Sequence, residues 1–145
     1  MPEILGLSGS LRRASVNTML LRTVSQLAPA GTTVEIASIR GIPLYDGDVD
    51  AAEGIPATVQ ELKRRITTTD GLLIVTPEYN NSIPGVLKNA IDWLSRPAED
   101  IRHVFGARPV AIIGATPGQA GTALAQTAWL PVLRTLGTVP GSAGG

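Results

Sequence analysis

Short apolar runs alternate with segments of helical periodicity along this chain, and this alternation constrains its fold more than any other feature. Four apolar runs have the length of strands and cover residues 3–7, 33–39, 71–76 and 109–114. Between and after them, apolar residues recur at helical spacing over 16–27, 56–66, 82–94 and 119–136. This order predicts an α/β fold, with a parallel sheet between two layers of helices and right-handed crossovers. The uninterrupted runs at 71–76 and 109–114 are typical of strands covered on both faces.

Size and composition favour one domain that does not bind nucleic acids. Of the 145 residues, 43% are hydrophobic, and 12 Lys and Arg balance 12 Asp and Glu. A net charge of zero with 3% aromatic residues disfavours nucleic-acid binding, which needs a basic face and stacking surfaces. The chain has no cysteine, which excludes disulfides, a thiolate nucleophile and cysteine-bound metals. Neither a basic leader nor an apolar run of ~18–20 residues is visible, so we expect a cytoplasmic protein without a membrane partner.

Three polar loops follow the carboxyl ends of predicted strands, at residues 8–17, 76–82 and 114–121. In open parallel sheets, ligands bind beyond these ends, at the point where the strand order reverses. We therefore expect the functional site to lie among these three loops.

The first loop combines hydroxyl, amide and guanidinium groups directly before a helix N-terminus. Its donors are Ser8, Ser10, Arg12, Ser15 and Asn17. Free N–H groups and the positive end of the helix dipole favour an anion there, and an arginine can hold a phosphate with two donors. The loop has neither a Walker A motif nor G-x-G-x-x-G, so a single terminal phosphate, as in FMN, fits better than ATP or a pyrophosphate. The alternative interpretation is an ordinary strand-to-helix turn with exposed arginines.

The second and third loops offer features that suit a flat heterocycle. Two prolines and a glycine within 77–85 predict a backbone path that exposes main-chain donors and acceptors. Tyr79 adds a flat apolar surface with a polar tip; the less favoured alternative is a simple turn in which Tyr79 is a packing residue. The glycine-rich loop 114–121 lets another segment approach closely.

Other candidate residues fit structural roles better. His103 has no spaced metal-ligating partner and is expected at the surface, and we predict no metal site. The aspartates at 46, 48 and 50 do not follow the EF-hand spacing, which favours a solvated acidic loop. Residues 63–65, Lys-Arg-Arg, are expected to face mainly solvent on their helix. Trp93 and Trp129 are expected in the core or at an interface.

Two stretches, residues 9–17 and 76–93, carry a family resemblance, with Ile42-Pro-Leu-Tyr-Asp46 as a third match. Through them the chain resembles the NADPH-dependent FMN reductase family, particularly its bacterial chromate and quinone reductase branch. Together with the order of strands and helices, the similarity extends to about Leu136. The second stretch is long and specific, and the first is moderately so.

The resemblance implies a flavodoxin-like, three-layer fold with FMN between strands 1 and 3. It implies a phosphate site made by Ser10, Arg12, Ser15, Val16, Asn17 and Thr18. It places the isoalloxazine ring against Pro77, Glu78, Tyr79 and Asn80, with Ser82 nearby and with Ala115 and Thr116 at the other edge. No side chain is assigned a catalytic acid, base or nucleophile role, because the flavin supplies the redox chemistry.

The end of the chain departs from the family pattern. We expect a domain over 1–136 with strand order 2-1-3-4, a missing fifth strand, and a flexible tail over 137–145. An uncovered strand edge and the family resemblance together predict a homodimer or homotetramer.

The predicted function is an FMN-dependent oxidoreductase that uses NADPH or NADH to reduce quinones, chromate or a similar small-molecule acceptor. A non-enzymatic flavodoxin-like electron carrier and an inactive truncated flavin-binding module are the alternatives. The sequence pattern does not distinguish NADPH from NADH as the electron donor, and it does not identify the acceptor.

Overall fold

A five-stranded parallel sheet forms the centre of the protein. The computed structural model describes residues 1–141. The strands have the spatial order β2-β1-β3-β4-β5, and every neighbouring pair is parallel. Their bounds are Glu3–Ser8 for β1, Thr33–Ala37 for β2, Gly71–Val75 for β3, Pro109–Ile113 for β4 and Val139–Pro140 for β5. The predicted flavodoxin-like α/β architecture is confirmed.

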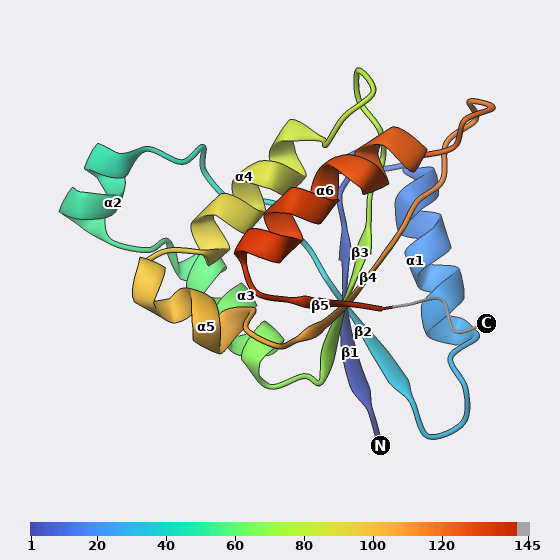
Figure 1. Ribbon diagram of the computed structural model, residues 1–145, viewed down its shortest axis with the longest axis horizontal. Coiled ribbons are helices and arrows are strands. Elements are labelled where there is room, and N and C mark those ends of the chain that lie inside the picture. Colours follow the sequence, from blue (N-terminus) through green and yellow to red (C-terminus); the bar gives the residue numbers. More distant parts are fainter. Residues whose placement is uncertain (142–145) are drawn as a thin grey trace.

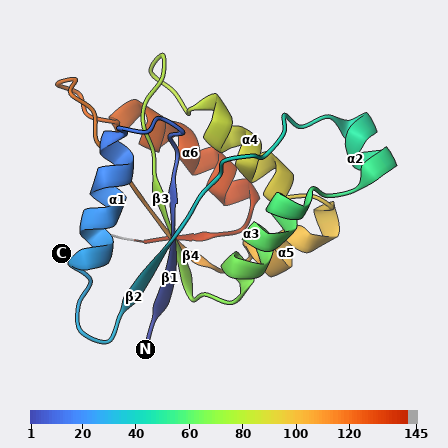
Figure 2. The ribbon, with the colours of Figure 1, turned by 180° about the vertical axis from the view of Figure 1, so that it is seen from behind.

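Helices cover both faces of this sheet, but unevenly. They are α1 (Val16–Gln26), α2 (Gly47–Glu53), α3 (Ala57–Thr67), α4 (Gly85–Leu94), α5 (Ile101–Val104) and α6 (Ala123–Thr135), with a 3₁₀ turn at Ala98–Asp100. Figures 1 and 2 show α1 alone on one face, with α3, α4 and α6 on the other. The short helices α2 and α5 were not predicted, since a segment of one or two turns has too few apolar positions to show a period.

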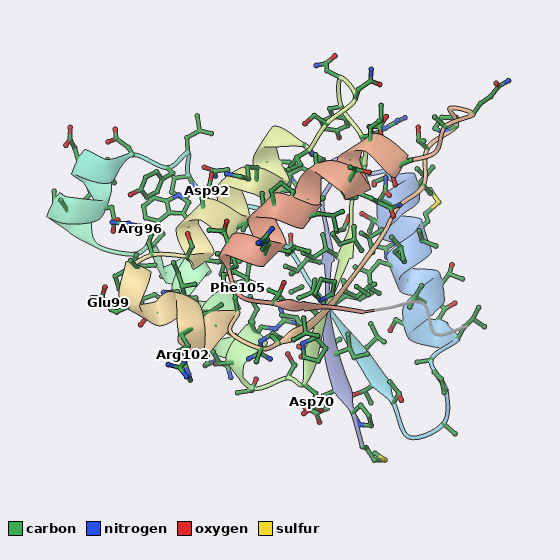
Figure 3. All side chains as sticks on the ribbon, viewed as in Figure 1. Asp70, Asp92, Arg96, Glu99, Arg102 and Phe105 are labelled. Atoms are coloured by element: carbon green, nitrogen blue, oxygen red, sulfur yellow. The ribbon has the colours of Figure 1, made fainter. Side chains whose placement is uncertain are left out.

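The main core lies between the sheet and α3, α4 and α6. Its largest fully buried side chains are Trp93, Trp129 and Phe105; the last is labelled in Figure 3. Of the two expected locations for Trp93 and Trp129, core or interface, the structure shows the core. Trp93 lies on α4, Trp129 on α6, and Phe105 directly after α5. Their burial in one core packs these helices against the sheet.

The opposite face is only partly covered, which corrects one expectation. β3 is buried on both faces, as predicted, but β4 is not, because Ala111 is exposed. A hollow of about 290 Å³ lies on the α1 side, and residues such as Ile4, Val24 and Leu73 line it. A single helix packs against the strands nearest to it, β1, β2 and β3, and leaves β4 open.

The prediction of a missing fifth strand is wrong. The N–H groups of Val139 and Gly141 donate to the carbonyl oxygens of Arg108 and Val110, at 2.9 and 2.8 Å. The Thr138 hydroxyl donates to the Leu133 carbonyl oxygen at 3.0 Å. A two-residue strand that contains proline shows no alternation, so the sequence pattern could not reveal it. Residues 137–141 thus belong to the sheet edge, whereas 142–145, the rest of the predicted tail, lie outside the described residues.

Two charged segments are more structured than predicted. Lys63 is mostly buried and donates to the Arg96 carbonyl oxygen and to Asp100, so only part of the 63–65 segment faces solvent. In the acidic loop, Asp46 caps α2 by accepting the Asp48 N–H at 2.9 Å, and Asp50 pairs with Arg96 at 3.2 Å. These long side chains reach carboxylates on other elements, which periodicity on one helix cannot foresee.

His103 is exposed, as predicted. None of the described helices has both the length and the apolar character needed to cross a membrane.

Candidate functional site

The carboxyl ends of β1, β3 and β4 bring the three polar loops to one edge of the sheet, as expected. They enclose a pocket, called here the cofactor pocket. Its lining includes most of the predicted site residues: Ser10, Arg12, Ser15, Val16, Asn17, Pro77, Glu78, Tyr79, Ala115 and Thr116. Pro117 also lines it and was missed, because a proline in a turn carries no functional signal of its own.

The first loop presents free backbone donors at the start of α1. Ser15 caps this helix, and its hydroxyl oxygen accepts the Thr18 N–H at 3.2 Å. Within the described residues, the N–H groups of Val16 and Asn17 have no acceptor. The first N–H groups of a helix lack intrahelical partners and carry its positive partial charge. The exposed Arg12 guanidinium lines the same pocket, so these groups form a cluster of donors of the kind that anions bind.

The Asn17 side chain, predicted as a donor for the phosphate, forms hydrogen bonds within the protein instead. Its Nδ2 donates to the Ala115 carbonyl oxygen at 2.9 Å, and its Oδ1 accepts the Ala115 N–H at 2.8 Å. The side chain is buried and both ends of its amide are satisfied. The Asn17 side chain therefore ties the first loop to the third, while its backbone N–H has no acceptor among the described residues.

Thr18 does not line the cofactor pocket. Its hydroxyl shares a hydrogen bond of 2.8 Å with that of Ser8, so it points toward β1 and a neighbouring cavity. The helix period explains this, because Thr18 is two positions after Val16, which lines the cofactor pocket, and side chains two positions apart on a helix do not face the same way.

The second loop is a small hairpin. Tyr79 and Ser82 exchange backbone hydrogen bonds of 3.2 and 3.0 Å, and Asn80 and Asn81 have φ angles of 51° and 61°. Two consecutive positive φ angles between such a pair match a type I′ turn, which asparagine tolerates well. Asn80 and Ser82 are not among the residues that line the pocket, and their place against and near the flavin ring stays a prediction. Tyr79 stays at the rim with 47% of its surface exposed.

Glu78 anchors this hairpin to α6. Its Oε2 accepts the N–H groups of Leu124 and Ala125, both at 3.0 Å. A carboxylate at a helix N-terminus satisfies free donors and complements the helix dipole. The negative charge of Glu78 is thus partly balanced by the N-terminus of α6, although the residue also lines the pocket.

Two glycines let the strand ends approach this closely. A Cβ atom on Gly9 would lie 2.6 Å from Leu87 Cδ2, and one on Gly114 would lie 2.2 Å from both the Thr76 carbonyl oxygen and Thr122 Oγ1. Contacts this short require a neighbouring atom to move. A side chain at Gly114 would meet the Thr76 backbone and push the third loop away, whereas one at Gly9 would first displace the end of the Leu87 side chain.

The comparisons with known proteins agree with this architecture. The NADPH-dependent FMN reductase family matches residues 2–144. The chain belongs to this family. It is 50% identical over 124 residues to an NAD(P)H-dependent FMN reductase of Pseudomonas aeruginosa, a match that covers 86% of this chain and 65% of that protein. It is 48% identical over 125 residues to a quinone reductase of Escherichia coli K12, with coverage of 86% and 65%. The chain thus spans just under two thirds of the length of these curated relatives.

A solved structure shows the same fold. The flavoenzyme NAD(P)H:(acceptor) oxidoreductase FerB from Paracoccus denitrificans superposes with a TM-score of 0.88 at 37% identity. The match covers all of this chain and 78% of that one. An FMN-dependent NADH-azoreductase from Bacillus anthracis, at 16% identity and a TM-score of 0.61, shares the fold alone.

Proposed function

We propose that this protein is an FMN-dependent oxidoreductase that uses NAD(P)H to reduce quinones, chromate or similar small acceptors. The observation that carries the proposal is the cofactor pocket, where free N–H groups and Arg12 lie at one end and the Tyr79 hairpin at the other. Family membership and the printed names of the relatives support the same activity.

The residues of the pocket fit FMN at the phosphate end. The N–H groups of Val16 and Asn17, the Ser10 hydroxyl and the Arg12 guanidinium supply donors of the kind that a phosphomonoester needs. Glu78, the one carboxylate among the described residues that line the pocket, does not compete for these donors, because it accepts hydrogen bonds from α6.

The ring end fits a flat group that stays partly open. The enclosed volume is about 130 Å³, less than the roughly 300 Å³ of a small enclosed ligand pocket. We infer that the phosphate and ribityl chain fill the enclosed part and that the ring lies along the rim near Tyr79 and Thr116. An open ring suits a reductase that must receive two different substrates in turn.

FMN, when bound, supplies the redox chemistry. The protein positions it: Glu78, Asn17 and the hairpin hydrogen bonds keep the rim in one shape, and buried Pro77 limits water behind it. No described side chain needs to act as an acid or base in this proposal.

We further propose that the protein forms a homodimer or homotetramer through α4 and the adjoining 40–55 segment. This segment is docked on α4, since Trp93 Nε1 and Asn89 Nδ2 both donate to the Pro43 carbonyl oxygen, at 2.8 and 2.9 Å. Next to it, Leu44 is 83% exposed, and an apolar side chain so exposed on a rigid segment is suited to an interface. Sedimentation at micromolar concentration tests this, and a monomer that retains FMN would contradict it.

Two measurements test the proposed activity. Flavin released by heat and identified by mass is expected to be FMN, at about one per chain; FAD, or no flavin after reconstitution, would refute the proposal. Stopped-flow mixing with NADPH or NADH is then expected to bleach the flavin, and a quinone or chromate to restore its colour. A flavin that stays oxidised would indicate an electron carrier, or an inactive binding module, instead.

A further inference from the structure

A second cavity lies beside the cofactor pocket, between α1 and the end of β2. Its volume is about 340 Å³, and its lining includes Arg12, Arg13, Arg22 and Arg40. We call it the arginine pocket. Ser10 and Arg12 line both cavities, so the two are neighbours separated only by the first loop.

The arginine pocket concentrates positive charge in a protein with no net charge. No Asp or Glu is among its lining residues. Elsewhere in the described chain, cations such as Lys63, Arg65 and Arg96 pair with carboxylates, but none of the four arginines here does so. Like charges gathered without a counterion repel one another, and a bound anion relieves this repulsion.

A hydrogen bond joins two walls of the cavity. Arg40 Nη2 donates to the Leu11 carbonyl oxygen at 2.6 Å, which ties the segment after β2 to the first loop across the cavity. Thr18 and Arg22 are four residues apart on α1 and so lie on one face of it, and both line the cavity.

The ligand must be an anion other than the phosphate of FMN. A phosphomonoester carries about two negative charges, and the free N–H groups and Arg12 already serve one such group in the cofactor pocket. The other guanidinium groups exceed what FMN requires. Among the reactants of the proposed function, chromate is itself an oxyanion and both nicotinamide cofactors carry a pyrophosphate, but only NADPH adds a phosphomonoester, at its 2′ position. A cavity of about 340 Å³ has the size of a small organic ligand site, which favours the nucleotide over a free oxyanion.

We propose that the arginine pocket binds a second phosphate dianion and that the 2′-phosphate of NADPH supplies it. This inference rests on the proposed function. It assigns a preference for NADPH over NADH to Arg13 and Arg22, which recognise a group that NADH lacks.

Calorimetric titration of the FMN-loaded protein tests the assignment. Adenosine 2′,5′-bisphosphate represents the distinctive part of NADPH, and 5′-AMP and inorganic phosphate are the comparison ligands. We expect the bisphosphate to bind at least about tenfold more tightly than 5′-AMP, because guanidinium–phosphate bonds are charge-assisted. The Arg22→Ala and Arg13→Ala variants should each lose about tenfold in bisphosphate affinity and keep their FMN content.

Arg102→Ala is the matched control. Arg102 lies on α5, across the sheet from α1, and Figure 3 shows it pointing away from the protein. This variant should bind the bisphosphate like the unaltered protein.

Equal affinity for the bisphosphate and 5′-AMP would overturn the proposal, as would an Arg22→Ala variant that binds normally. Inorganic phosphate that binds as tightly as the bisphosphate would overturn the assignment to NADPH, because the pocket would then recognise a free ion. Failure of the proposed function shows separately, as a protein that takes up no FMN at all.

Discussion

The two ends of the cofactor pocket differ in how their polar groups are used. At the ring end, hydrogen bonds within the protein fix the loops. They are the backbone bonds of the Tyr79 hairpin, the bonds from α6 to Glu78, and the bond between Asn17 and Ala115. At the phosphate end, the N–H groups of Val16 and Asn17 and the Arg12 side chain have no acceptor among the described residues. The proposed ring end is therefore held in shape by the protein's own hydrogen bonds, and the proposed phosphate end keeps its donors free for a ligand.

The largest expected effect comes from breaking the rigidity of the ring end at Gly114. Gly114→Ala places a methyl group 2.2 Å from the Thr76 carbonyl oxygen, so we expect about 3 kcal/mol less stability, measured by urea unfolding. Gly85→Ala is the control, because no atom lies within 4 Å of its Cβ position and alanine favours the helix. If both variants unfold alike, the close approach of the loops is not what constrains this end.

Arg12→Ala tests the phosphate end alone. Loss of a charge-assisted contact should weaken FMN binding by about 1.5–3 kcal/mol and leave riboflavin, which has no phosphate, nearly unchanged. Fluorescence titration with both flavins measures the difference. Equal losses for FMN and riboflavin would place Arg12 away from the phosphate.

Asn17→Ala tests the hydrogen bonds that join the first loop to the third. The change removes both hydrogen bonds to Ala115, and buried groups left unsatisfied should lower stability by about 1.5 kcal/mol. Because the side chain acts on the third loop, FMN and riboflavin should weaken equally. A selective loss of FMN affinity would mean that the Asn17 amide itself binds the phosphate.

Tyr79→Ala should have the smallest effect, about 1 kcal/mol on flavin affinity, since the half-exposed ring contributes contact area and no charge. We expect the same loss for FMN and riboflavin in the same titration. Unchanged riboflavin affinity would show that the tyrosine does not contact the flavin ring.

Much of this fold was predictable because its signals are local. The continuous apolar run before Thr76 and apolar helix positions such as Leu87 and Leu133 each reflect burial within a single element, and these residues are buried. The pairing of the two-residue strand at Val139 depends on the neighbouring strand β4. The exposure of Ala111 depends on which helices cover β4. Neither neighbour is visible in the local sequence pattern.

The same division holds for the site. The sequence alone determined which loops meet and which residue types they bring, because strand ends of a parallel sheet share one edge and the residues around Arg12 and Tyr79 are chemically distinctive. Only the tertiary structure decided that the Asn17 side chain hydrogen-bonds to Ala115 and that Glu78 accepts hydrogen bonds from α6. It also decided that four arginines line one cavity. The reason is physical: a polar side chain bonds with whatever lies nearest in space, and for these residues that neighbour is distant in the chain.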